Sequence, residues 1–117
     1  RQSNLSLRNM TFCFAVTIDL IKKVRINITN KNIIEQLIRS ATSIGANYFE
    51  ANGSSSKKDF INKIAISKKE AIETQYWLRM LNKTDNNLKE EIIKLWDEAK
   101  QIGMILSKII SNVRKTV

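Results

Sequence analysis

Hydrophobic residues recur every three or four positions along this chain, and the strict alternation that marks a half-buried strand is absent. This spacing predicts a first helix over about residues 9–26. Its apolar face consists of Phe12, Ala15/Val16, Asp19/Leu20 and Val24, with Asp19 as a polar intrusion. A turn at Asn27–Asn30 is expected next, because Asn and Thr side chains favour caps and turns.

A second helix is predicted over about residues 30–51. Its buried face consists of Ile34, Leu37/Ile38, Ala41, Ile44/Gly45 and Tyr48. The segment from Asn52 to Ser56 should end this helix, with Gly53 suited to the left-handed position that follows a helix. Ser56 and Asp59 have the spacing of a capping box, which predicts the start of the next helix.

The third helix is expected over about residues 56–82 and the fourth over about residues 87–115. The core stripe of the third is Phe60, Ile64, Ser67, Ala71, Thr74, Leu78 and Leu81. That of the fourth is Leu88, Ile92, Leu95/Trp96, Ala99, Ile102/Gly103, Leu106, Ile109/Ile110 and Val113. Gly103 lies between Ala99 and Ser107 in a small-residue stripe, which predicts a close helix crossing there.

Four helices joined by short turns predict an all-α, antiparallel up-down-up-down four-helix bundle, as a single domain over residues 1–117. The absence of proline favours long, uninterrupted helices. No apolar run reaches the roughly 18 residues of a membrane span, and no signal peptide is recognisable. We therefore expect a cytoplasmic protein without a membrane partner.

The residues available for catalysis are few, because the chain has no histidine and one cysteine, Cys13. This composition excludes zinc fingers and catalytic triads with histidine. Cys13 lies in an apolar run and is expected to be a small buried residue. For the carboxylates of Glu70 and Glu73 we expect ion pairs with Lys63, Lys69 or Arg79 rather than a metal. The prediction is a protein that is not an enzyme and has no cofactor or metal.

Twenty Lys and Arg against eleven Asp and Glu give a net charge of +9, which favours a polyanionic partner such as nucleic acid. A second explanation competes with this one. Lys, Asn and Ile make up 44 of the 117 residues, and all three have A/T-rich codons. The charge therefore indicates either a binding surface or a bias in composition.

Basic residues follow one face of the third predicted helix. Lys57, Lys68 and Arg79 recur every eleven residues, close to three helical turns, with Lys58, Lys69 and Lys83 beside them. A straight cationic stripe matches the repeated phosphates of a nucleic acid, although it also describes a solvated helix face. Lys22, Lys23 and Arg25 form a second candidate group, which the dipole of the first helix also explains.

The same helix has two edges of opposite charge, which predicts a head-to-tail contact between copies and a closed homo-oligomer. The basic edge is Lys57, Lys68 and Arg79, and the acidic edge is Asp59, Glu70 and Glu73. Ile61, Ile72 and Tyr76 lie among the basic residues and complete the predicted contact surface.

Three segments in the middle of the chain resemble one bacterial family. They are Leu37–Ala51 (LIRSATSIGANYFEA), Ser56–Phe60 (SKKDF) and Lys69–Leu78 (KEAIETQYWL). In this order they are similar to the four-helix-bundle family of 23S rRNA intervening-sequence proteins, over about residues 9–115. The name refers to coding sequences within inserts of ribosomal RNA genes.

The resemblance implies a left-handed bundle that assembles as a ring, typically a pentamer. It also implies similarity to the accessory variability determinant of diversity-generating retroelements, a nucleic-acid-binding ring, so that a reverse transcriptase is a candidate protein partner. Two hypotheses follow from the sequence: a ring that binds RNA or DNA without strong sequence specificity, and a structural or protein-interaction bundle whose charge is incidental.

Overall fold

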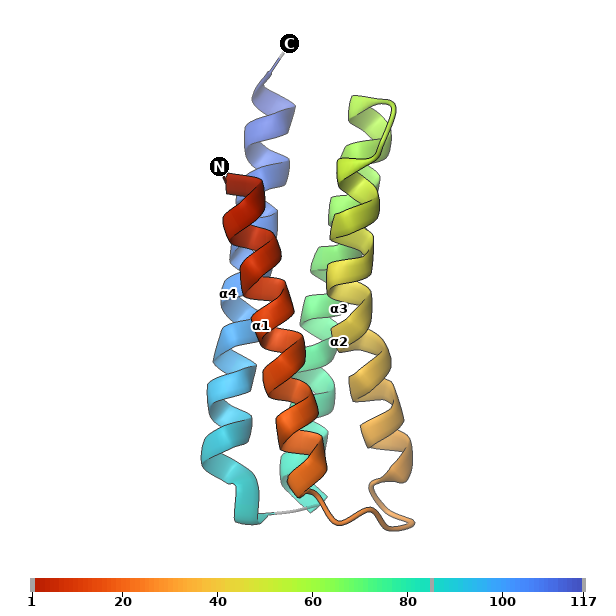
Figure 1. Ribbon diagram of the computed structural model, residues 1–117, viewed down its shortest axis with the longest axis vertical. Helices are drawn as coiled ribbons and strands as arrows, with labels where there is room; N and C mark the ends of the chain where they lie inside the picture. Colours follow the sequence, from red (N-terminus) through yellow and green to blue (C-terminus); the bar gives the residue numbers. More distant parts are fainter. Residues whose placement is uncertain (1, 85, 117) are drawn as a thin grey trace.

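The computed structural model describes residues 2–84 and 86–116, with side chains for residues 9–11, 13–84 and 87–116. Within these residues the α-helices are α1 (Gln2–Lys23), α2 (Lys31–Asn52), α3 (Lys57–Thr84) and α4 (Lys89–Lys115) (Figure 1). A short 3-10 turn, Asn86–Leu88, leads into α4, and no strand occurs in the described part. The predicted all-α fold is therefore confirmed.

The helices run alternately up and down and form an elongated bundle with extents of 50 × 22 × 18 Å. α1 packs against α2 and α4, and α3 packs against the same two helices more extensively. The first turn of α1 and the last turn of α4 lie at the same end of the bundle as the α2–α3 turn (Figure 1). The α1–α2 and α3–α4 connections lie at the opposite end.

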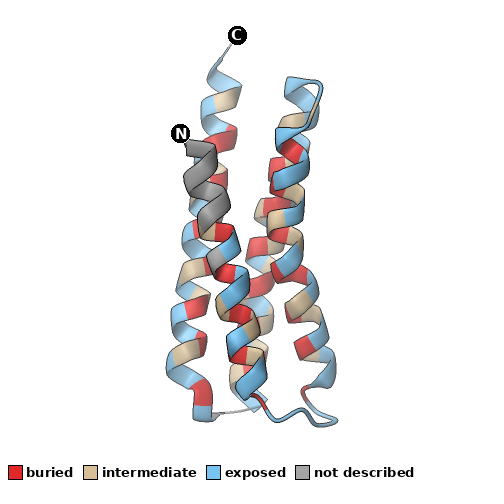
Figure 2. Ribbon diagram, in the orientation of Figure 1, coloured by how far each residue is buried: buried red, intermediate tan, exposed pale blue. Residues whose placement is uncertain are grey.

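The buried side chains form one continuous core along the bundle (Figure 2). On α3 every predicted core residue from Ile64 to Leu81 is buried, and only Phe60 is partly exposed. The predicted faces of α2 and α4 are buried as well, with Ser40 and Ala51 added on α2. None of the described helices is long and apolar enough to cross a membrane.

The predicted buried face of the first helix was right at Leu20 and Val24 and wrong at Ala15 and Asp19. Its buried residues are Met10, Cys13, Thr17, Leu20 and, just after the helix, Val24. Ala15 and Asp19 are exposed, and the Phe12 side chain lies outside the described residues. The apolar run at residues 12–16 covers more than one face, so spacing alone did not fix the orientation. Thr17 is buried because its hydroxyl donates a 2.8 Å hydrogen bond to the carbonyl oxygen of Cys13.

Two expectations about glycine were also wrong. Gly53 has φ −95°, which is not left-handed, and its N–H donates to the carbonyl oxygen of Glu50 at 3.1 Å. At Gly103 an added Cβ would meet nothing within 4 Å, so no neighbouring helix crosses closely there. The serine cap of α3 is present, since Ser56 Oγ accepts a 3.0 Å hydrogen bond from the N–H of Asp59.

Candidate nucleic-acid interface

A groove of about 670 Å³ runs along the outer seam between α3 and α4. Four of its lining residues are basic: Lys68 and Lys69 on α3, and Arg114 and Lys115 on α4. The antiparallel packing of the two helices brings the middle of α3 beside the last turns of α4. We call this surface, with the floor described below, the basic groove.

The cations of the basic groove have no ion-pair partners among the described residues. The ion pairs of the described residues all lie outside the groove. They join Lys23 to Glu91, Arg39 to Glu70 and Glu73, and Lys63 to Glu50. No described residue that lines the groove is acidic. No ion pair with a described residue therefore neutralises the positive charge of this surface, which favours an anionic ligand.

The lining also includes three apolar residues, Ala65, Ile72 and Ile110, which we call the floor of the groove. Ile72 is 55% exposed, a high value for an isoleucine, whereas Ile110 belongs to the edge of the core. The hydroxyl-bearing side chains of Ser107 and Ser111 complete the α4 side. A ligand in this groove would meet cations on both sides and an apolar surface beneath.

The three cations spaced eleven residues apart all lie toward α4. Lys68 lines the basic groove, and Arg79 lines a second hollow of about 190 Å³ farther along the seam, with Asn82 and Trp96. Lys57 donates from Nζ to the carbonyl oxygen of Thr116, just after the end of α4. The predicted stripe thus follows the seam between α3 and α4.

The remaining predicted cations are divided between two regions. Lys58, Lys69 and Lys83 are exposed on α3, and of these Lys69 lines the basic groove. Lys22 and Lys23 end α1, and Arg25 follows in the α1–α2 connection. This connection lies at the end of the bundle opposite the last turn of α4 (Figure 1). Lys23 is paired there with Glu91 at 3.4 Å. The structure therefore does not join this second group to the first.

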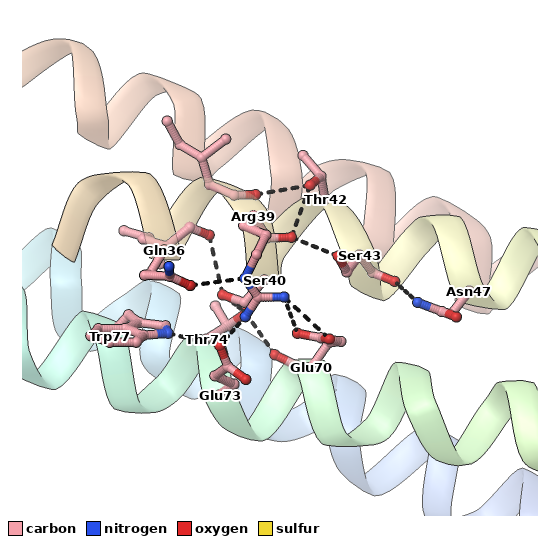
Figure 3. Close-up of polar contacts among 12 residues, drawn as sticks. Gln36, Arg39, Ser40, Thr42, Ser43, Asn47, Glu70, Glu73, Thr74 and Trp77 are labelled. Atoms are coloured by element: carbon pink, nitrogen blue, oxygen red, sulfur yellow. Dashed lines mark hydrogen bonds and ion pairs between the residues drawn. The ribbon is translucent and has the colours of Figure 1, made fainter. Parts of the chain in front are cut away.

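Two of the three acidic residues predicted for an oligomer contact, Glu70 and Glu73, form ion pairs with α2 (Figure 3). The Arg39 guanidinium on α2 donates to both carboxylate oxygens of Glu70, at 3.1 and 3.3 Å, and also to Glu73. The Glu73 carboxylate accepts a further 3.0 Å hydrogen bond from the indole N–H of Trp77. Arg39 is the partner of both carboxylates, and the expected pairs with Lys63, Lys69 or Arg79 are wrong.

The other acidic groups of this flank are more exposed. Asp59 lies in the first turn of α3, and its side chain has no ion pair with a described residue. Lys63 pairs with Glu50 on α2 at 2.9 Å, and this hydrogen bond raises the pKa of the Lys63 ammonium. No group of three metal-ligating side chains is found in the described part of the chain.

The three apolar residues predicted for the contact surface differ in exposure. Ile72 and Tyr76 are about half exposed, as predicted. Ile61 is partly buried and packs against the core, so its description as free apolar surface was wrong. Its position explains this, because Ile61 precedes the buried Ile64 by three residues and so flanks the core stripe of α3.

Cys13 is buried, as expected from its apolar neighbours. Burial raises the pKa of its thiol from 9.0 to about 11, and the negative charge of Glu98 on α4 adds to the rise. A thiol in this environment is protonated at neutral pH and is a poor nucleophile.

The α4 side of the groove was not predicted from sequence as part of a site; it consists of Arg114, Lys115, Ser107 and Ser111. A signal was present, since Arg114 and Lys115 are basic residues in the last turn of a predicted helix. Without the register between α3 and α4, however, nothing connected them with Lys68 and Lys69.

These features define a small antiparallel four-helix bundle with a cationic groove between its last two helices. The chain belongs to the 23S rRNA-intervening sequence protein family, whose sequence profile matches residues 3–108. The chain is also similar to a crystal structure of a protein with unknown function from the S23 ribosomal protein family of Bacteroides thetaiotaomicron VPI-5482. The two share 31% identity and superpose with a TM-score of 0.82, over 95% of this chain and 99% of that one. Comparison with curated proteins gives no match.

Proposed function

We propose that this protein is a non-enzymatic nucleic-acid-binding bundle that holds the phosphates of RNA or DNA in the basic groove. The observation that carries the proposal is the set of four unpaired cations on both sides of one groove, with no carboxylate in its lining. Lysine and arginine that neutralise phosphates release counterions, and this release drives binding without sequence specificity. A cytoplasmic location is part of this proposal.

The distribution of charge supports this proposal over a bundle whose charge is incidental. A separate hollow of about 310 Å³ between α1 and α4 is lined by Glu91, Asp97 and Glu98, together with Lys94. Three acidic side chains of α4 therefore line a hollow beside α1, whereas the groove cations, which have no ion pair with a described residue, lie beside α3. A bias toward lysine codons would scatter charge rather than separate it.

We also propose that the protein acts as a closed homo-oligomer, for which the ring implied by the family resemblance gives five subunits. Several large apolar side chains away from the basic groove are exposed to water in a single chain, including Phe49, Ile66 and Met104. Repeating the groove around a ring would present several cationic surfaces to one nucleic-acid molecule and increase the overall affinity.

Binding can be tested by fluorescence anisotropy with labelled RNA and DNA at about 50 and 200 mM salt. We expect the double variant Lys68→Glu/Arg114→Glu to lose about tenfold or more in affinity, because phosphate contacts are replaced by repulsion. The matched control is Lys31→Glu/Lys94→Glu, which changes the net charge equally at exposed positions outside the groove. Equal losses in both variants, or no binding by the intact protein at about 50 mM salt, would favour the interaction-bundle alternative.

A further inference from the structure

We infer that the basic groove takes a single strand rather than a duplex, with phosphates on its two sides and unpaired bases on its floor. This inference rests on the proposed function and names the form of nucleic acid that the site accepts. It follows from the position of the cations, the chemistry of the floor and one aromatic side chain beside it.

The position of the cations favours a narrow ligand. The groove lies between two packed helices, whose axes are typically about 8–10 Å apart. Lys68 and Lys69 come from one helix, and Arg114 and Lys115 come from the other. A backbone lying in the groove can contact cations on both sides, whereas the convex wall of a duplex would rest on the rims and leave the floor uncovered.

The floor favours unpaired bases. Ile72, Ala65 and Ile110 offer apolar surface that neither phosphate nor sugar uses. In a duplex the flat faces of the bases are stacked on one another inside the helix, so this surface would stay in water. In a single strand the base faces are free, and burying them against Ile72 is favourable. The hydroxyls of Ser107 and Ser111 lie where they can bond sugar or phosphate oxygens.

Tyr76 extends this surface along α3. It follows Ile72 by one helical turn, about 6 Å along the axis, and is 53% exposed. The ring of Trp77 packs edge-on against it, with ring centroids 4.9 Å apart and planes at 74°. Trp77 is held in turn by its hydrogen bond to Glu73. An exposed, ordered aromatic ring beside cations is the stacking platform that single-strand-binding surfaces use.

The test compares a labelled, unstructured strand of about 20 nucleotides with the duplex of the same sequence, by anisotropy, across a series of salt concentrations. We expect the single strand to bind about tenfold or more tightly than the duplex. If four cations of the groove contact phosphates, log K for the strand should fall with log salt at a slope of about −3 for each occupied groove.

Two variants test the floor without changing charge: Ile72→Ala and Tyr76→Ala. Each should lower single-strand affinity by about five- to a hundredfold, with an unchanged salt slope and unchanged duplex affinity. Ile28→Ala is the control, since Ile28 is an exposed apolar residue in the α1–α2 turn and lines neither hollow of the α3–α4 seam. Thermal unfolding and light scattering on each variant should show an unchanged fold and an unchanged assembly mass.

The outcomes separate the two proposals. Duplex affinity equal to that of the strand, or Ile72 and Tyr76 variants that behave like Ile28→Ala, would overturn this inference and leave nucleic-acid binding in place. A change in assembly mass on substituting Ile72 or Tyr76 would assign these residues to a subunit contact and also overturn it. Absence of binding to strand and duplex alike, or displacement of the strand by polyglutamate at equal charge, would reject the nucleic-acid proposal itself.

Discussion

The buried hydroxyl of Ser67 on α3 donates a 2.6 Å hydrogen bond to the backbone carbonyl oxygen of Ile44 on α2. A side chain this short can reach the backbone of another helix only where the two helices approach closely. Farther along the same interface, Thr74 Oγ1 lies 2.9 Å from Ser40 Oγ, and both side chains are buried. Small residues at the core positions of α3 thus bring α2 near, and their hydroxyls satisfy one another or the backbone.

The first prediction concerns this contact. Ser67→Ala should lower the free energy of unfolding by about 1 kcal/mol, because one hydrogen bond is lost while the Ile44 carbonyl keeps its place in the helix. Ser67→Leu should cost at least about 1–3 kcal/mol, because the larger side chain must push α2 away. Chemical denaturation monitored by circular dichroism measures both. Ser55→Leu, at an exposed position in the α2–α3 turn, should leave stability nearly unchanged; a comparable loss there would contradict the argument.

A second prediction distinguishes the role of the Arg39 ion pairs in stability from the role of the basic groove in binding. Arg39→Ala removes a guanidinium that bridges two carboxylates, one of which, that of Glu70, is mostly buried, with its side chain 14% exposed. We expect a loss of about 1–2 kcal/mol in unfolding free energy, larger than for an exposed pair because the pairs form a network. Nucleic-acid affinity should change little, because Arg39 lies on α2 and not in the groove.

Arg114→Ala is the reciprocal variant, since Arg114 lines the groove and has no ion pair with a described residue. Its unfolding free energy should stay within about 0.5 kcal/mol of the parent protein, while affinity for nucleic acid falls. Chemical denaturation gives the unfolding free energy of each variant, and fluorescence anisotropy gives its affinity for nucleic acid. If Arg39→Ala weakened binding more than Arg114→Ala, the nucleic-acid-binding surface would lie on the α2–α3 flank and not in the basic groove.

Much of this fold could be predicted from sequence, because α2, α3 and α4 each have a single apolar stripe that stays on one face of the helix. On α3 the stripe from Ile64 to Leu81 was predicted residue by residue, although two of its members are Ser67 and Thr74. The regular spacing was enough there. On α1 the run at residues 12–16 is apolar on every face, so the position of Thr17 in the core depended on a local hydrogen bond that periodicity does not contain.

The candidate site could be predicted only in part. Lys57, Lys68 and Arg79 lie on one helix, so their common direction follows from sequence spacing alone. The pairing of Arg39 with Glu70 and Glu73, and the meeting of Lys68 with Arg114, depend on the register between neighbouring helices. Periodicity within one helix gives its buried face but not its axial offset from the next helix. Contacts between residues on neighbouring helices could therefore be identified only from the structure.

A third prediction concerns assembly. Light scattering at micromolar concentration should give a mass that is a multiple of 13.5 kDa. Apolar side chains such as Phe49 and Met104 are exposed in the single chain, and an interface between copies would remove them from water. Replacing Met104 with Lys should weaken the assembly if this residue lies in the contact, without lowering the stability of the helix it belongs to. A mass of 13.5 kDa throughout would reject the closed oligomer.

The last prediction uses the buried thiol of Cys13. Its pKa is raised from 9.0 to about 11 by burial and by Glu98, so the folded chain holds the thiol proton to higher pH than the unfolded chain does. Cys13 therefore contributes stability that is fully present below about pH 9 and is lost as pH rises through about pH 11.

At pH 8 the thiolate form of Cys13 is about a hundredfold less populated in the folded chain than in the unfolded chain. A disulfide reagent such as DTNB should consequently label it only as fast as the protein opens, and denaturant should restore full reactivity. Comparing unfolding free energies of the parent and Cys13→Ala from pH 8 to pH 11 isolates this group from the lysines and tyrosines that titrate nearby in pH. The parent should lose stability relative to the variant over that range, and a constant difference, or rapid labelling without denaturant, would show that the α1–α4 interface is open around Cys13.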